Sequence, residues 1–142
     1  SHEFVFDETF DTSATNEAIY HKAVKNLVKS IIDGGKASCF AYGQTGSGKT
    51  FTMMGNDPNN PSVASENAGL YVLAARDIFQ SIITENLDTL GVFVSCFEIY
   101  GGKLYDLLNC RGAVKCLEDS KQQVHLSGLT DHEICKVQDL LD

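Results

Sequence analysis

The sequence contains no long hydrophobic run, no internal repeat and no low-complexity tract. Its longest uncharged apolar stretch, residues 37–42 with their flanks, is far shorter than the roughly 20 residues that a helix needs to cross a bilayer. Proline is also scarce, and both prolines fall within residues 56–68. Several Asn and Ser residues accompany them, so this segment is predicted to be a surface loop. These absences argue against a membrane-spanning helix and against a repeat architecture.

The sequence also lacks a C-x-x-C pair, and its cysteines are odd in number. The five are scattered along the chain: Cys39, Cys96, Cys110, Cys116 and Cys135. This pattern argues against a disulfide framework and against a zinc site, so we expect a reduced, intracellular protein. No secretory leader is visible, and because the sequence begins with Ser1 rather than Met we expect it to be part of a longer protein.

Basic charge is in short supply, with 11 Lys and Arg against 19 Asp and Glu and a formal net charge of −8. This balance argues against a general nucleic-acid binder and against binding to anionic membranes, so we expect neither partner. The composition, 43% hydrophobic and 21% charged, is that of a globular protein, and 142 residues allow one domain of ordinary size.

Apolar periodicity predicts a helix over residues 15–33, ended by Gly34 and Gly35. The residues at helical spacing are Tyr20, Val24, Leu27, Val28 and Ile31. Residues 36–42 are short, apolar and aromatic, which predicts a buried strand. A glycine-rich turn follows, and a short helix is predicted to begin at Lys49.

Helical spacing returns at Tyr71, Ala75, Ile78, Phe79 and Ile82. Residues 91–100 are apolar on both faces and are predicted to form a central strand, with a short helix over residues 101–109 beside it.

The last part of the sequence predicts a hairpin and a helix. Residues 114–119 and 123–129 are expected to pair across residues 120–122. Thr130 and Glu133 have the spacing of a capping box, which predicts a last helix from Thr130. Strands alternating with helices favour an α/β domain whose sheet is covered on two faces.

One segment matches the phosphate-loop pattern G-x-x-x-x-G-K-[ST]. Its residues are Gly43, Gln44, Thr45, Gly46, Ser47, Gly48, Lys49 and Thr50. The glycines let successive backbone N–H groups point at phosphate oxygens, Lys49 is predicted to reach the β- and γ-phosphates, and the Thr50 hydroxyl is predicted to hold Mg²⁺. The alternative is a glycine-rich turn that carries Lys and Thr by chance, which is rare in a chain of this length.

Hydrolytic residues are harder to find. The only D-x-x-G in the sequence begins at Asp88 and lies between a predicted helix and a strand, so its carboxylate is at the wrong end and a turn is expected. Arg76 falls within the second long helix and Arg111 within a turn. We therefore assign no catalytic residue to this chain.

Three blocks resemble kinesin motor domains. Residues 41–55 are similar to the family's nucleotide loop, and the spacing of Phe4, Phe6, Asp7 and Phe10 is similar to the strand that enters its first helix. Residues 97–100 followed by 103–108 resemble the strand and helix after the loop. The resemblance covers residues 1–142 and implies an α/β fold, the three-layer P-loop NTPase sheet of a kinesin motor, present in part.

Residues 34–40, residues 117–124 and Gly102 in place of an acidic residue resemble the kinesin-13 subfamily, which removes tubulin from microtubule ends rather than walking. The resemblance implies the ATP-binding part of a microtubule-dependent motor with ATP and Mg²⁺ as cofactors. It also implies tubulin or microtubules as the partner, and a place in the cytoplasm on the cytoskeleton. It says nothing of the oligomeric state.

The resemblance adds two candidate contacts. The residue after the loop threonine often stacks on adenine in kinesins; here it is Phe51, and core packing is the equal alternative. Residues 120–122 correspond to a loop that faces tubulin, where Lys121 is the only basic residue and an ordinary hairpin tip is the alternative. Residues 56–68 correspond to the loop that interrupts the family's second helix near the nucleotide.

Other family segments are expected outside this sequence. Both switch segments are expected after Asp142, and the segment that flanks adenine and the kinesin-13 loop before Ser1. The main basic tubulin-binding helix is also absent. Two rival hypotheses therefore stay open: a non-catalytic nucleotide- or tubulin-binding module, and another P-loop ATPase such as a small kinase.

Overall fold

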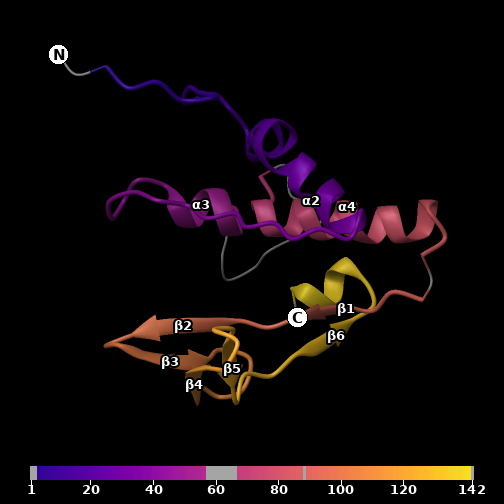
Figure 1. The fold of residues 1–142 in the computed structure, drawn as a ribbon. Coiled ribbons are helices and arrows are strands. Elements are labelled where there is room, and N and C mark those ends of the chain that lie inside the picture. Colours follow the sequence, from indigo (N-terminus) through magenta and orange to yellow (C-terminus); the bar gives the residue numbers. More distant parts are fainter. Residues whose placement is uncertain (1–2, 57–66, 88, 142) are drawn as a thin grey trace. The chain divides into compact units, whose positions relative to one another are not determined.

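The computed structural model describes residues 3–56, 67–87 and 89–141, which are drawn as a coloured ribbon in Figure 1. The chain forms two compact units. The first comprises Ser1–Leu90 and Lys136–Asp142, and the second is Gly91–Cys135. No helix within the described ranges has the length and apolar composition that a bilayer span requires.

The first unit begins its regular structure with one long helical segment, which confirms the helix predicted over residues 15–33. It consists of α1 (Asn16–Ile19), a π-helical stretch η1 (Tyr20–Val24) and α2 (Lys25–Ile32). The Thr15 hydroxyl caps the start by accepting the Ala18 N–H at 3.2 Å.

Two glycines end α2, as the sequence predicts. Gly34 has φ +85°, and its N–H donates to Ile31 O at 2.9 Å. The Gly35 N–H donates to Ser30 O at 2.8 Å. This is a Schellman motif, in which the left-handed residue satisfies two carbonyls at the helix end.

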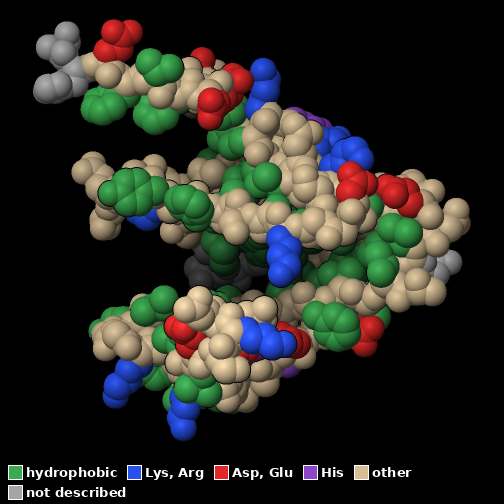
Figure 2. All heavy atoms as spheres, in the orientation of Figure 1, with side chains coloured by type: hydrophobic (Ala, Val, Ile, Leu, Met, Phe, Trp, Pro, Cys, Tyr) green, Lys and Arg blue, Asp and Glu red, His purple; other side chains and the backbone are tan. Residues whose placement is uncertain are grey.

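The predicted strand over residues 36–42 is wrong. These residues have no regular structure, and the Phe40 and Tyr42 side chains are 84% and 97% exposed. A strand is stable when a neighbouring strand pairs with it, and no segment within the described residues does so here. The segment around Phe4 and Phe6 likewise forms no strand, and its exposed hydrophobic side chains are visible in Figure 2.

Two further helices of the first unit confirm the sequence prediction. They are α3 (Lys49–Met54), which follows the glycine-rich loop, and α4 (Leu70–Thr84). A 3-10 helix, η2 (Val137–Leu140), belongs to the same unit.

The core of the first unit lies between the first helical segment and α4, which run beside one another in Figure 1. Its buried residues are Tyr20, Val24, Val28, Ala68, Leu70, Val72 and Leu73. Val137 and Leu141, in and next to η2, pack against this cluster. Burying a valine or leucine side chain contributes about 1.5–3 kcal/mol. Met53 of α3 also packs against this cluster, so the core holds the helices that flank the glycine-rich loop.

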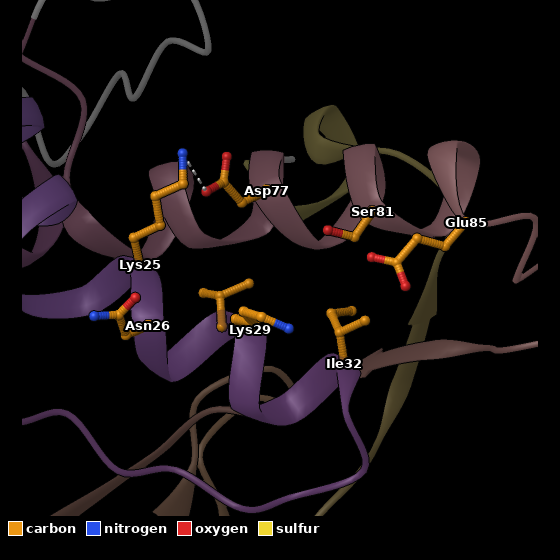
Figure 3. Close-up of a pocket in the computed structure, with 8 residues that line it drawn as sticks. Lys25, Asn26, Lys29, Ile32, Asp77, Ser81 and Glu85 are labelled. Carbon is orange, nitrogen blue, oxygen red and sulfur yellow. Dashed lines mark ion pairs between the residues drawn. The ribbon is translucent and has the colours of Figure 1, made fainter.

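A polar network crosses from the helical segment to α4. The Tyr20 hydroxyl donates to Asp77 Oδ2 at 2.8 Å, and Lys25 Nζ lies 4.0 Å from the same oxygen. Burial, together with the hydrogen bond to Asp77, raises the pKa of Tyr20 well above its usual value, so the phenol stays a donor at every ordinary pH. Lys25 and Asp77 also border a groove of about 290 Å³. Figure 3 shows the side chains that line it. Its lining residues come from α2, α4 and the residue just after α4, and none belongs to the glycine-rich loop.

We expect Tyr20→Phe to lower the free energy of unfolding by about 1 kcal/mol, because Asp77 loses a donor while the aromatic ring stays packed. Urea unfolding followed by circular dichroism measures the change. Tyr71→Phe is the matched control, since Tyr71 is half-buried and its hydroxyl has no hydrogen bond within the described residues. Equal losses in the two variants would contradict the role of the hydrogen bond.

The second unit is built from antiparallel strands. β1 (Val92–Val94) pairs with β6 (His132–Ile134), with Val92 opposite Ile134. The other strands form a four-stranded sheet in the order β2-β3-β4-β5. They are β2 (Phe97–Tyr100), β3 (Lys103–Asp106), β4 (Gly112–Glu118) and β5 (Val124–Ser127).

The hairpin predicted across residues 120–122 is confirmed, because β4 and β5 pair with Glu118 opposite Val124. Two other predictions for this unit are wrong. The strand expected over residues 91–100 is divided into β1 and β2, which lie in different sheets. The helix expected over residues 101–109 is β3 and a turn.

The turn between β2 and β3 explains the second error. Gly101 and Gly102 have φ values of +57° and +74°, and Tyr100 lies opposite Lys103 across them. Two consecutive left-handed residues make the two-residue turn that suits a β-hairpin, and glycine adopts it without strain. The hairpin turn therefore prevails over the helical preference of the residues that follow.

The last predicted helix is also wrong. Residues from Thr130 lead into β6, and the Thr130 hydroxyl does not cap a helix but donates to Asp106 Oδ2 at 2.5 Å. The Thr130 N–H donates to the same oxygen at 2.9 Å, and the Leu108 N–H donates to Asp106 Oδ1 at 2.9 Å. Asp106 is fully buried, so three donors compensate for the solvation that its carboxylate loses.

Candidate nucleotide-binding site

The glycine-rich loop lies between the end of α2 and the start of α3, and its backbone needs glycine at defined positions. Gly46 and Gly48 have φ values of +81° and +90°, and Gly48 is the residue that precedes the first turn of α3. A side chain at Gly43 would overlap the Ser47 hydroxyl. Glycine therefore allows both the left-handed turns and the close approach of the two ends of the loop.

The loop leaves backbone donors available. Its one internal backbone hydrogen bond runs from Ser47 N to Gln44 O at 3.2 Å. The N–H groups of Thr45, Gly46 and Gly48 donate no hydrogen bond within the described part of the chain. Exposed N–H groups in a tight left-handed turn are the donors that bind phosphate oxygens in anion-binding loops.

Lys49 lies against the loop that precedes it. Its Nζ donates to Gly43 O at 2.8 Å and to Gln44 O at 2.7 Å. These contacts hold the ammonium group at the loop, although the side chain extends from the first residue of α3. The arrangement places one positive charge beside the free backbone donors.

A cavity of about 360 Å³ opens at the loop. Its lining residues are Thr45, Gly46, Gly48, Lys49, Thr50 and Phe51. The Phe51 side chain is 44% exposed, so part of its ring is available for stacking. Among the described residues that line this cavity there is no acidic side chain and no arginine.

Thr50 is the residue that fits a magnesium ion. It is exposed at the cavity, and its hydroxyl has no hydrogen bond within the described residues. Mg²⁺ in nucleotide sites commonly takes one or two protein oxygens and completes its shell with phosphate oxygens and water. No group of three His, Cys, Asp or Glu side chains in the described ranges is arranged to hold a metal ion by itself.

Sequence analysis missed one residue near this site. Asn16 is 1% exposed, and its Nδ2 donates to Phe51 O at 3.0 Å and to Ala68 O at 3.2 Å. It therefore joins the start of α1 to α3 and to the residues just before α4. Its position after the helix cap Thr15 gives no sequence signal for this role, because the partners lie 35 and 52 residues away.

The other candidate residues lie elsewhere. Lys121 is in the turn between β4 and β5 and belongs to the second unit, whereas the glycine-rich loop belongs to the first. Arg76 lies within α4, as predicted, and Arg111 lies in the turn before β4, where it pairs with Glu98 and stacks 5.1 Å from the Tyr105 ring centroid. Residues 57–66 of the predicted loop and Asp88 of the D-x-x-G lie outside the described residues.

A family model described as the kinesin motor domain matches residues 1–142. The chain therefore belongs to the kinesin motor domain family.

The chain is also similar to particular members of this family. The chain is 45% identical over 142 residues to human (Homo sapiens) kinesin-like protein KIF24 and 44% identical over 141 residues to its mouse (Mus musculus) counterpart. In each case the match covers 99% of this chain and 10% of the relative, so the chain spans about a tenth of the length of these proteins.

Among solved structures, a fast kinesin described for its ATPase mechanism and its interactions with microtubules matches with a TM-score of 0.82 and 31% identity. The match covers 97% of this chain and 38% of that one. The kinesin motor fold expected from the sequence is confirmed.

Proposed function

We propose that this chain forms the phosphate-binding part of the ATP site of a microtubule-dependent kinesin motor. The observation that carries the proposal is the geometry of residues 43–50. Free backbone donors and the Lys49 ammonium group meet at one exposed cavity, in a chain of the kinesin motor domain family. A nucleoside triphosphate presents the negative charge and the row of oxygens that such a cavity fits.

Each residue then has a defined task. The N–H groups of Thr45, Gly46 and Gly48 bind phosphate oxygens, and Lys49 exchanges its contacts with the loop carbonyls for the β- and γ-phosphates. The Thr50 hydroxyl is a ligand for Mg²⁺, which when bound neutralises part of the phosphate charge. The exposed part of Phe51 stacks on the adenine.

In this proposal, hydrolysis depends on switch segments that the 142 residues do not contain. We expect residues 1–142 expressed alone to release no phosphate from ATP, since none of the described residues that line the loop cavity is acidic. A coupled phosphate-release assay measures this, with the longer native protein as the positive control. Steady turnover that Lys49→Ala abolishes would mean that this chain carries a metal-holding acid that we have not identified.

For the whole protein we propose a depolymerase of kinesin-13 type, which acts on tubulin in the cytoplasm and on the microtubule cytoskeleton. The support is the sequence of residues 34–40 and 117–124 together with the likeness to KIF24. Gly102 adds less, because the turn before β3 requires a left-handed residue there in any case. Release of soluble tubulin from stabilised microtubules in the presence of ATP tests this proposal, and gliding without release would contradict it.

The proposed tubulin contact is Lys121. Asp119 braces its turn by accepting the Lys121 N–H at 2.7 Å and the Gln123 N–H at 2.9 Å. The hydrogen bond with His125, followed by these two amide donors, holds the pKa of Asp119 below its usual value. The carboxylate thus keeps the turn ordered at neutral pH, with Lys121 exposed at its tip.

We expect Lys121→Glu in the native protein to lower microtubule affinity modestly, because it reverses a charge that faces an acidic surface. The loss should shrink as salt screens the contact. Co-sedimentation with microtubules at two salt concentrations measures it. Lys22→Glu is the charge-matched control, since Lys22 is an exposed side chain of the first unit. An altered affinity for ATP with unchanged microtubule binding would contradict the assignment.

A further inference from the structure

We propose that Asn16 is a positioning residue for the nucleotide site. Through its side-chain amide it fixes the helix that carries Lys49 and Thr50 against the chain segment that leads into α4. The inference rests on the proposed function, because its consequence is a change in nucleotide affinity.

The first step is that α3 depends on contacts from outside itself. It has six residues, so few of its backbone groups are paired within the helix. A helix this short is not stable alone in water. The Gly55 N–H already donates to Phe51 O at 2.9 Å, and the Asn16 amide donates to the same oxygen at 3.0 Å. Asn16 thus attaches the C-terminal part of α3 to the start of α1.

The second step is that the same amide also holds the returning chain. Its other contact is Ala68 O, which belongs to the core of the first unit. Gly55 and Ala68 form an isolated antiparallel bridge at this point, and the Asn56 N–H donates to Asn67 O at 3.3 Å. One side chain therefore connects three segments that are far apart in the sequence.

The third step is that the segment just after α3 crosses the segment just before α4 in close contact. At this crossing neither backbone has room to shift. A Cβ at Gly69 would overlap the carbonyl of Met53, and one at Gly55 would come within 2.7 Å of Asn67 O. Gly55 also has φ +95°. Because the backbones touch, a shift of the segment before α4 is transmitted directly to the last residues of α3.

The fourth step concerns the environment of Asn16. Its Oδ1 has no hydrogen-bond partner within the described residues and is almost completely enclosed. An apolar side chain would fill this space without burying an unpaired acceptor. What favours an amide at this position is therefore its pair of N–H contacts. They reach the carbonyls of Phe51 and Ala68, which belong to the two segments that cross.

The test compares Asn16→Asp with Asn26→Asp in the native protein that contains this chain. Asn16→Asp keeps the size of the side chain but removes both N–H donors and places a carboxylate against two carbonyls. We expect the dissociation constant for a fluorescent ATP analogue to rise about two- to tenfold, the loss that one or two hydrogen bonds represent. Asn26→Asp makes the same substitution at an exposed site on α2 and should leave the constant unchanged.

A second pair of variants separates positioning from stability. Asn16→Ala removes the donors without adding charge, and Val28→Ala opens a cavity in the core of the first unit from a residue of α2. Both should lower the melting temperature. Measured well below both transitions, only Asn16→Ala should weaken ATP binding. If both variants lose stability and both bind ATP like the wild type, Asn16 has no positioning role. If Asn16→Asp does not fold, Asn16→Ala decides the question.

Lys49→Ala distinguishes failure of this inference from failure of the proposed function. If the wild type binds ATP, Lys49→Ala binds it weakly and the Asn16 variants bind it normally, only the positioning role is overturned. If the wild type binds no nucleotide, the proposed function and the positioning role are both overturned. The expected result is weakened binding in Lys49→Ala and in both Asn16 variants.

Discussion

Lys49→Ala in the native protein is expected to weaken ATP binding by about ten- to a hundredfold. Among the described residues that line the loop cavity, Lys49 carries the one positive charge, and its ammonium group already contacts the carbonyls of Gly43 and Gln44. A charge-assisted hydrogen bond to phosphate contributes roughly 1.5–3 kcal/mol, and alanine removes it entirely. Titration with a fluorescent ATP analogue measures the change.

Two controls make this result specific. Lys36→Ala removes a lysine from an exposed position seven residues before the loop, and it should leave the affinity unchanged. Thr50→Ala should instead reduce the dependence of binding on Mg²⁺, because it removes an oxygen ligand rather than a charge. If Lys49→Ala binds ATP as tightly as the wild type, residues 43–50 do not form a phosphate site.

Asp106→Asn is expected to lower the melting temperature of the second unit by several degrees. The Asp106 carboxylate accepts hydrogen bonds from Leu108 N, Thr130 N and Thr130 Oγ1, and it is fully buried. An amide has one oxygen in place of two, so at least one of these donors would face an NH₂ group. Asp131→Asn makes the same substitution at an exposed neighbouring site and should have little effect.

Lowering the pH should weaken the same hydrogen bonds, because it protonates the Asp106 carboxylate. The hydrogen bond from the Thr130 hydroxyl lowers the pKa of Asp106, and the two backbone donors and the charge of His132 act in the same direction, against the opposing effect of burial. The stability that Asp106 contributes is therefore fully present above the ordinary carboxyl pKa of about 3.9. It is lost as the pH falls through the lower pKa of the folded state. Melting curves recorded from pH 6 downward should show the difference between wild type and Asp106→Asn narrowing once the pH falls below the ordinary carboxyl pKa.

Local signals were enough to predict the α-helices of the first unit from the sequence. Apolar residues at helical spacing located α2 and α4, and Gly34 predicted the end of α2 because a left-handed residue is needed there. The π-helical stretch at Tyr20–Val24 had no such signal, since it shifts the hydrogen bonding of a helix without changing its composition.

The strands were predicted less well because they depend on partners. Residues 36–42 and 91–100 have similar apolar composition, yet the first forms no strand and the second divides between two sheets. Composition reports that a segment can be buried in a sheet, whereas pairing depends on segments far away in the sequence. Gly101 and Gly102 are a local hairpin signal that the predicted helix over residues 101–109 left out of account.

For the candidate site too, local sequence patterns were easier to interpret than contacts between distant residues. The glycine-rich loop could be located from the sequence, because phosphate binding requires particular residue types at fixed spacing, and its binding of phosphate stays a prediction. Asn16 was missed because its contacts with Phe51 and Ala68 exist only after the chain has folded. Thr130 was misassigned for a related reason: its hydroxyl can cap a helix or donate to a distant carboxylate, and only the fold decides between them.

The second unit is an insertion in the sequence of the first unit, and the pairing of β1 with β6 joins the two ends of this insertion. Val92 lies opposite Ile134, and paired antiparallel residues are separated by about 5 Å, so the two ends of Gly91–Cys135 lie close together. If Gly91–Cys135 were deleted, a linker of a few residues would therefore be enough to join Leu90 to Lys136. The first unit could then be produced as a continuous chain that keeps both the glycine-rich loop and η2. In the same way, the second unit could be replaced by the corresponding segment of a relative.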